Sequence, residues 1–243
     1  MRAEIVGSGA RVVLVHGSVS GPGAWNGQRE LAARYRLELL TRPGSPPEPP
    51  VESVDFAEHA ALLREHLAGE PAHLVGHSYG GVVCLLAAVG LPLRSLTVIE
   101  PPCLGIARGE PEVGEFIAAM ERHWAEGPRD PRAFLEVFLQ AVGSALALPD
   151  PLPPELEQSA RTLMVERMPS EAEIPFAELR AAPFPKLVVS GAHHPAFDAV
   201  CDVLERELPA QRVVLPGYGH AVQRAPGFNA ALQAFLDRGG SSK

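Results

Sequence analysis

The stretch Gly76-His77-Ser78-Tyr79-Gly80 decides the fold of this 243-residue chain. It follows a short apolar run, 73–75, and precedes a longer apolar run, 81–88. A Gly-x-Ser-x-Gly pattern between a strand and a helix predicts a sharp turn with the serine at its apex. The two glycines lack a Cβ, so neighbouring backbone can pass closely. We therefore expect Ser78 to be a nucleophile at the start of a helix, whose N–H groups face a developing negative charge.

Composition indicates a globular protein with one large core. Hydrophobic residues make up 46% of the chain and charged residues 21%, which is ordinary for a soluble domain. The net charge of −8 disfavours nucleic acid or an anionic membrane as the main partner. No segment resembles a signal peptide, and no apolar run could span a bilayer. We expect a cytoplasmic protein with a small-molecule substrate, and leave open whether it is a monomer or a homodimer.

The three cysteines predict packed thiols in a reduced state. Cys84, Cys103 and Cys201 are far apart in the chain, and none forms a Cys-x-x-Cys pair. A sparse, odd set fits neither a disulfide framework nor a zinc site. We therefore expect no disulfide, no metal and no cofactor.

Short apolar runs alternate with helical patterns over most of the chain. Such alternation implies right-handed crossovers and a mostly parallel sheet. We expect an α/β fold with a central sheet of about seven strands flanked by helices. The predicted strands are 3–6, 11–15, 36–40, 73–75, 96–99, 186–189 and 211–215, and the predicted helices are 28–35, 54–68, 197–208 and 227–238.

The alternation stops between residues 103 and 182. Apolar residues recur there at helical spacing in three stripes separated by proline-rich breaks, without convincing strands. We therefore divide the chain into a core, residues 1–102 and 183–243, and a helical insertion, residues 103–182, which follows the strand that ends at Glu100.

A serine hydroxyl needs a base, a group that orients the base, and donors for the oxyanion. The candidate base is His220, which follows the last predicted strand. The carboxyl ends of parallel strands meet at one edge of a sheet, so His220 and Ser78 should lie close together. The expected oxyanion donors are the backbone amides of Tyr79 and of Ser18, in the loop after an earlier strand; Val19 is an alternative to Ser18.

These features together resemble the α/β-hydrolase superfamily over nearly the whole chain. The resemblance adds further motifs to the stretch around Ser78, namely His16-Gly17 with Trp25 downstream, Arg42-Pro43-Gly44, Glu100-Pro101-Pro102 and Gly219-His220. In that superfamily an insertion at this point forms a cap over the active site. Serine at position 78, rather than aspartate, disfavours the dehalogenase and epoxide-hydrolase classes.

The acid departs from the pattern of that superfamily. Its members usually carry an aspartate three residues after the glycine that ends the penultimate strand. Here that glycine is Gly191, and the position holds His194. An imidazole cannot supply the carboxylate, so we expect Glu100 to be the acid, with Asp198 as the alternative.

The remaining aromatic and histidine residues receive weaker assignments. We expect His16, Trp25 and Trp124 to line the substrate pocket. His193 and His194 invite a metal interpretation, but adjacent side chains rarely point the same way and no further ligand is evident in the sequence. We expect both to be loop residues at the edge of the pocket.

Three functions remain open at this point. The first is a serine hydrolase that cleaves a small or medium carboxylic ester, lactone or thioester through an acyl-enzyme on Ser78. The second is a C–C bond hydrolase, lyase or cyclase-type tailoring enzyme on the same scaffold, which the unusual acid position favours. The third is a non-catalytic small-molecule binding protein, because a fold does not determine a function.

Overall fold

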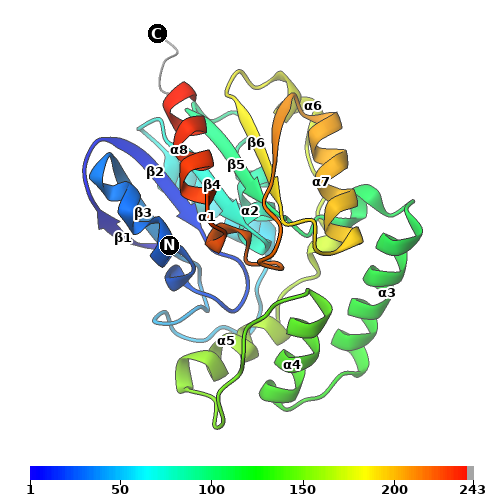
Figure 1. Ribbon diagram of the computed structural model, residues 1–243. Helices are drawn as coiled ribbons and strands as arrows, with labels where there is room; N and C mark the ends of the chain where they lie inside the picture. The colour runs from blue at the N-terminus through cyan, green and yellow to red at the C-terminus, as the bar shows by residue number, and fades with distance from the viewer. Residues whose placement is uncertain (240–243) are drawn as a thin grey trace.

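Seven strands form one sheet in the computed structural model, which describes residues 1–239 (Figure 1). Their order is β1-β3-β2-β4-β5-β6-β7, and all neighbours are parallel except β1 and β3. The predicted fold class is therefore confirmed. The strands are β1 Arg2–Val6, β2 Ala10–Val15, β3 Tyr35–Thr41, β4 His73–His77, β5 Ser95–Ile99, β6 Lys186–Ser190 and β7 Ala210–Val214.

Both faces of the sheet are covered, which explains the apolar strands. Val13 and Val15 of β2 pack on one side, in a core that includes residues of α1, α2 and α7. Val12 and Leu14 point to the other side, towards η1 and α8. A parallel strand buried on both faces needs apolar residues at successive positions. The covering elements are η1 Pro22–Ala33, α1 Phe56–Leu67, α2 Tyr79–Ala87, α7 Pro195–Glu207 and α8 Phe228–Gly239.

One predicted helix differs in type and position. The segment expected to form an α-helix over 28–35 is instead the 3₁₀ helix η1, and Tyr35 already belongs to β3. Gly23 and Gly27 fall inside η1, and glycine has a low propensity for an α-helix. The segment therefore forms short, tight turns that hold its apolar side chains against the sheet.

A helical block separates β5 from β6, and its helices lie within the predicted insertion, residues 103–182. Its helices α3, α4 and α5 lie together at one end of the sheet (Figure 1). No helix within residues 1–239 is long and apolar enough to cross a membrane. The elements of the insertion are η2 Leu104–Ala107, α3 Pro111–Glu126, α4 Pro131–Ala141, α5 Pro154–Met164, η3 Pro169–Glu171 and α6 Phe176–Ala181.

Proline marks the beginnings of the three long helices of the insertion. Pro111, Pro131 and Pro154 each occupy the first turn, where a missing N–H costs no intrahelical bond. The helices α4 and α5 share a small core of their own, in which Phe134 packs near Leu163. The insertion thus has its own packing, and its treatment as a separate structural unit remains a prediction.

Candidate active site

Ser78 stands at a sharp turn between β4 and α2. Its φ of 53° lies in the left-handed region, which a non-glycine residue adopts only where the surroundings hold it. A Cβ at Gly76 would come within 2.6 Å of the Gly80 carbonyl oxygen, and one at Gly80 would collide with the His16 backbone. The two glycines of the pattern therefore allow the backbone contacts that keep Ser78 in this conformation.

Three polar side chains form a continuous hydrogen-bonded chain at this turn. The hydroxyl of Ser78 lies 2.8 Å from Nε2 of His220. Nδ1 of the same ring lies 2.7 Å from a carboxylate oxygen of Glu100. Exposure is 7% for Ser78, 7% for His220 and 0% for Glu100. An ionised carboxylate only accepts, so Nδ1 donates to Glu100 and Nε2 is left to accept the serine proton.

The carboxylate of Glu100 is held in its ionised form. Burial opposes this by raising the pKa, but hydrogen bonds from His193 and His220 outweigh burial and lower the pKa of Glu100 to about 2. The amide of Gly191 donates a further hydrogen bond to this carboxylate at 2.7 Å. Glu100 is therefore an anion at neutral pH, in contact with the ring that faces Ser78.

Asp198 and His194 do not take part in this chain. Asp198 lies in the first turn of α7, and its carboxylate faces Arg212 at 3.9 Å. His194 precedes the same helix, and its Nδ1 accepts a hydrogen bond from the Ala196 amide at 3.2 Å. The imidazole thus serves as the N-cap of α7 at the position where the superfamily usually carries an aspartate. Of the two candidate acids, the structure brings Glu100 to His220.

The loop after β2 passes directly beside Ser78. A Cβ at Gly17 would come within 2.7 Å of the Ser78 Cβ, so this glycine is required by the close approach. Ser18 lines the same cavity as Ser78 and Tyr79, and it also lines a wider cleft beside Ser78, which Val19 lines as well. Both predicted oxyanion amides therefore belong to segments that border the serine.

The ring of His77 contacts the backbone of His220. Its Nε2–H donates a hydrogen bond to the backbone carbonyl oxygen of His220 at 2.8 Å. Burial lowers the pKa of His77 to about 3, so the ring is neutral. A neutral ring that donates from Nε2 fixes the position of the His220 backbone without adding a charge beside it.

The predicted pocket residues His16 and Trp25 lie elsewhere than expected. Trp25 is fully buried in the core between η1, the sheet and α8. His16 is also fully buried, and its Nε2 accepts a hydrogen bond from the Arg42 amide at 3.1 Å. Neither residue lines the cavities beside Ser78, because η1 turns Trp25 towards the sheet and the loop turns His16 away from the serine.

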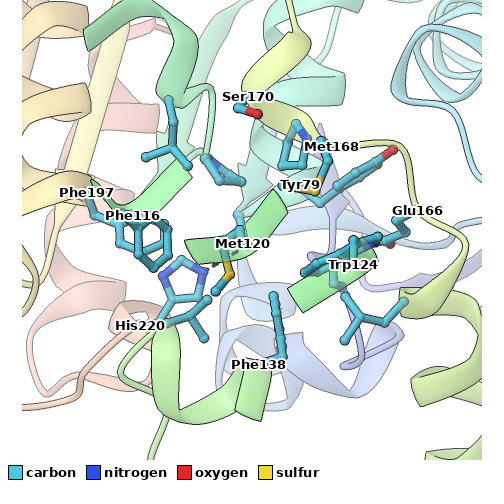
Figure 2. A pocket seen from close by; sticks show the side chains of 17 residues that line it. Tyr79, Phe116, Met120, Trp124, Phe138, Glu166, Met168, Ser170, Phe197 and His220 are labelled. Carbon is cyan, nitrogen blue, oxygen red and sulfur yellow. Dashed lines mark hydrogen bonds between the residues drawn. The ribbon is translucent and has the colours of Figure 1, made fainter. Parts of the chain in front are cut away.

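A cavity of about 40 Å³ lies between Ser78 and the insertion. Its wall is almost wholly apolar, and Trp124 is one of the residues that line it. Phe116 and Phe197 lie on the His220 side, whereas Trp124 and Glu166 lie on the opposite side (Figure 2). The other lining residues are Ser18, Ser78, Tyr79, Pro102, Leu104, Met120, Phe138, Val142, Leu163, Met168, Pro169 and Ser170.

A buried ion pair borders this cavity. Sequence reasoning missed this pair. Arg42 lies 2.9 Å from the carboxylate of Glu166, and both side chains are buried. The guanidinium also donates to the Gly17 carbonyl oxygen at 3.0 Å and lies 4.7 Å from the centre of the Tyr79 ring. The other carboxylate oxygen of Glu166 contacts the Ser18 hydroxyl. This pair therefore links the insertion to the loop after β2.

His193 is the second site residue without a role in the sequence analysis. Its ring lies 3.1 Å from the Glu100 carboxylate, on the side away from His220. Glu100, His193 and His220 thus form a cluster whose potential ligand atoms lie within 4.8 Å of one another. The expectation that no such cluster accompanies His193 is wrong. In this structure the atoms are engaged in hydrogen bonds with one another, and the absence of a metal remains a prediction.

Comparisons with known proteins identify the family. The sequence family described as "Alpha/beta hydrolase family" matches residues 12–232. A pimeloyl-[acyl-carrier protein] methyl ester esterase of Aeromonas salmonicida is 34% identical over 157 residues, 60% of each chain. A 2-hydroxy-6-oxo-6-phenylhexa-2,4-dienoate hydrolase of Comamonas testosteroni is 32% identical over 146 residues, 55% of this chain and 51% of that protein. This chain therefore aligns with roughly half to three fifths of these relatives.

Solved structures extend the similarity to the whole chain. An alpha/beta hydrolase from Sphaerobacter thermophilus is 27% identical with a TM-score of 0.69, over 97% of this chain and 95% of that one. MenH from S. aureus has a TM-score of 0.74 at 16% identity, over 99% of this chain and 100% of that one, and shows the fold alone. On the sequence match over residues 12–232 and on this architecture, the chain belongs to the alpha/beta hydrolase family.

Proposed function

We propose that this protein is a serine hydrolase that cleaves a small or medium carboxylic ester, lactone or thioester through an acyl-enzyme on Ser78. The observation that carries the proposal is the chain of hydrogen bonds from Ser78 through His220 to Glu100, at 2.8 and 2.7 Å. A neutral imidazole whose Nδ1–H donates a hydrogen bond to a carboxylate can accept the serine proton at Nε2.

The first half of the reaction follows from this geometry. Ser78 Oγ attacks the acyl carbon while its proton passes to Nε2 of His220. Glu100 stabilises the imidazolium that forms, through the hydrogen bond that it already accepts. The amides of Tyr79 and Ser18 donate to the oxyanion, and the beginning of α2 adds the positive end of its dipole. His220 then gives its proton to the departing oxygen or sulfur atom.

The second half releases the acyl group. A water molecule replaces the leaving group, His220 removes its proton, and the resulting hydroxide attacks the acyl carbon. The intermediate collapses to a carboxylic acid, and the proton returns to Ser78 Oγ. The apolar cavity suits the acyl group, because burying apolar surface there contributes binding energy. The wider cleft beside Ser78 suits the leaving group.

The decisive experiment compares the wild type with Ser78→Ala on p-nitrophenyl esters of increasing acyl length. We expect the variant to lose at least a thousandfold in kcat/KM. A fluorophosphonate should label the wild type stoichiometrically and leave the variant unlabelled. Full esterase activity of Ser78→Ala would refute the proposal.

A C–C bond hydrolase is the second candidate. The relative from Comamonas testosteroni carries the name of a phenylhexadienoate hydrolase, and aromatic side chains line the cavity here. Cleavage of a vinylogous 1,5-diketone, followed by the loss of its absorbance, would distinguish this reaction from ester hydrolysis. A binding protein without activity is the third candidate, and isothermal titration with turnover assays on the same ligands separates it from both enzymes.

A further inference from the structure

Both ring nitrogens of His193 face oxygen atoms that accept hydrogen bonds. Nδ1 lies 3.1 Å from a carboxylate oxygen of Glu100. Nε2 lies 3.1 Å from the backbone carbonyl oxygen of Val142, the residue that ends α4. The ring is half-buried, and it stacks on Phe197 with 5.7 Å between the ring centres. His193 therefore joins the acid of the proposed site to the end of a helix of the insertion.

This geometry defines the charge on His193. A carbonyl oxygen and an ionised carboxylate can only accept, so both ring nitrogens must carry a proton to make both bonds. The doubly protonated ring is a cation. Burial opposes the charge, but the hydrogen bond from His193 to Glu100 and the charge of that carboxylate raise the pKa of His193 above its ordinary value. The negative end of α4 at Val142 acts in the same direction.

The surroundings of His193 contain both signs of charge. Glu100 lies at the end of β5, and Asp198 adds a second carboxylate from α7, which favours the cation. The ring of His194 lies 6.2 Å away and that of His220 5.9 Å away, between centres. Of these four groups, all within residues 1–239, only Glu100 forms a hydrogen bond with the His193 ring, and it accepts one from His220 as well.

The end of α4 touches the base as well as His193. The amide of His220 donates to the Gly143 carbonyl oxygen at 3.4 Å. Gly143 has a φ of 64°, and a Cβ there would come within 2.7 Å of the His193 ring. Two successive carbonyl oxygens of the insertion thus dock on the two histidines that flank Glu100.

We propose that His193 is a positioning residue which, as an imidazolium, couples the docking of the insertion to the orientation of Glu100. This rests on the proposed function, in which Glu100 is the acid. The ring holds the carboxylate from one side while it holds α4 from the other. A neutral ring has one N–H and gives up one of the two contacts, so the insertion and the acid are both fixed only in the protonated state.

The sign of the pH effect follows. A raised pKa means that the doubly bonded state is complete at acidic pH and is lost as the pH rises through the raised pKa. Activity that depends on both contacts should therefore decline on the alkaline side of the pH profile.

The kinetic test compares His193→Gln with the wild type and with His194→Asn. Asparagine retains the N-cap of α7, so the second variant is the matched control. We expect His193→Gln to raise KM several-fold and to abolish the alkaline decline of kcat/KM. His194→Asn should retain the profile of the wild type. If the alkaline limb of His193→Gln stays in place, the residue has a packing role only and the proposal is wrong.

A second measurement is made on the wild-type protein and does not depend on turnover. One-bond ¹⁵N–¹H couplings in histidine-labelled wild-type protein report which ring nitrogens carry protons. We expect two protonated nitrogens in the His193 ring at a pH below 6.5, the ordinary histidine value, with the ring assigned by its contacts to Phe197. A His193 ring with one proton overturns the proposal. The same spectrum of Ser78→Ala separates the proposal about His193 from the proposed function, because it reports the protonation of His193 whether or not Ser78 is the nucleophile.

Discussion

The carboxylate of Glu166 meets the hydroxyl of Ser18 across the boundary between the insertion and the core. The same carboxylate pairs with Arg42 at 2.9 Å. The loop that is proposed to supply an oxyanion amide is therefore fixed by a residue more than a hundred positions away. A change in the position of Glu166 in the insertion would therefore also shift the loop beside Ser78.

Glu166→Ala should destabilise the protein strongly. It leaves the Arg42 cation buried beside an apolar cavity, and breaking such a pair costs about 3–5 kcal/mol. Urea unfolding measures the free energy. The control is Glu157→Ala, which removes a surface pair with Arg161 and should cost less than about 1 kcal/mol. Similar losses in the two variants would show that the buried pair does not hold the loop.

Glu100→Gln should abolish most turnover while Asp198→Asn does not. The amide cannot stabilise the imidazolium of His220, so kcat should fall by roughly a thousandfold or more. Asp198 faces Arg212 instead, and its variant should stay within a few-fold of the wild type. Steady-state kinetics on one p-nitrophenyl ester is sufficient. If only Asp198→Asn loses turnover, the acid is Asp198 of α7 and not Glu100.

Met120→Ala should shift the acyl preference towards longer chains. Met120 lines the apolar cavity and is 6% exposed, so truncation adds space for about three heavy atoms. Its loss should also cost about 2–5 kcal/mol of stability. The measurement is kcat/KM over a series of p-nitrophenyl esters. Val137→Ala, at an exposed position of α4, is the control and should leave the optimum unchanged. An unchanged optimum in Met120→Ala would place the acyl chain outside this cavity.

Arg224 should favour substrates with an anionic leaving group. It is the charged side chain of the wider cleft beside Ser78, where no carboxylate is found among the described lining residues. Arg224→Gln should lower kcat/KM several-fold for an ester whose alcohol carries a carboxylate. The matched neutral ester should change little. Equal effects on both esters would contradict the assignment.

Stability should fall between pH 4.5 and pH 2, partly because of Glu38. Burial raises the pKa of this carboxyl, but hydrogen bonds from His66 and Arg11 outweigh burial and lower the pKa to about 2. A depressed pKa contributes stability above the unfolded value, and that contribution is lost as the pH falls towards 2. The shift corresponds to at most about 3 kcal/mol. Urea unfolding of Glu38→Gln should depend less steeply on pH, whereas Glu115→Gln, exposed on α3, should follow the wild type. Parallel curves would contradict the prediction.

The fold was largely predictable because its signals are local. A parallel strand buried on both faces reads as an apolar run, as in β2, and the strained turn at Ser78 requires glycines at fixed positions. The error at 28–35 has the same origin. An apolar period alone does not separate an α-helix from the 3₁₀ turns of η1. Gly23 and Gly27, which precede the predicted helix but lie inside η1, favour the tighter turns.

The site was predictable only where chain order reveals proximity. Ser78, Glu100 and His220 each follow a strand of one parallel sheet, so their side chains converge at one edge. His193 was missed because half of its role is a bond to the Val142 carbonyl oxygen, which has no signature in the sequence. Trp25 was misplaced because an aromatic residue near a functional loop can equally serve the core, as it does here.

The insertion reaches the two histidines beside Glu100 through the main-chain oxygens of Val142 and Gly143. Main-chain oxygens are present whatever the side chains are. Mutations on the cavity-facing side of α3 and α4 can therefore accumulate without removing these docking bonds. If the proposed function holds, substrate choice can change without loss of the catalytic groups, and those helices are then the natural place for a directed-evolution library.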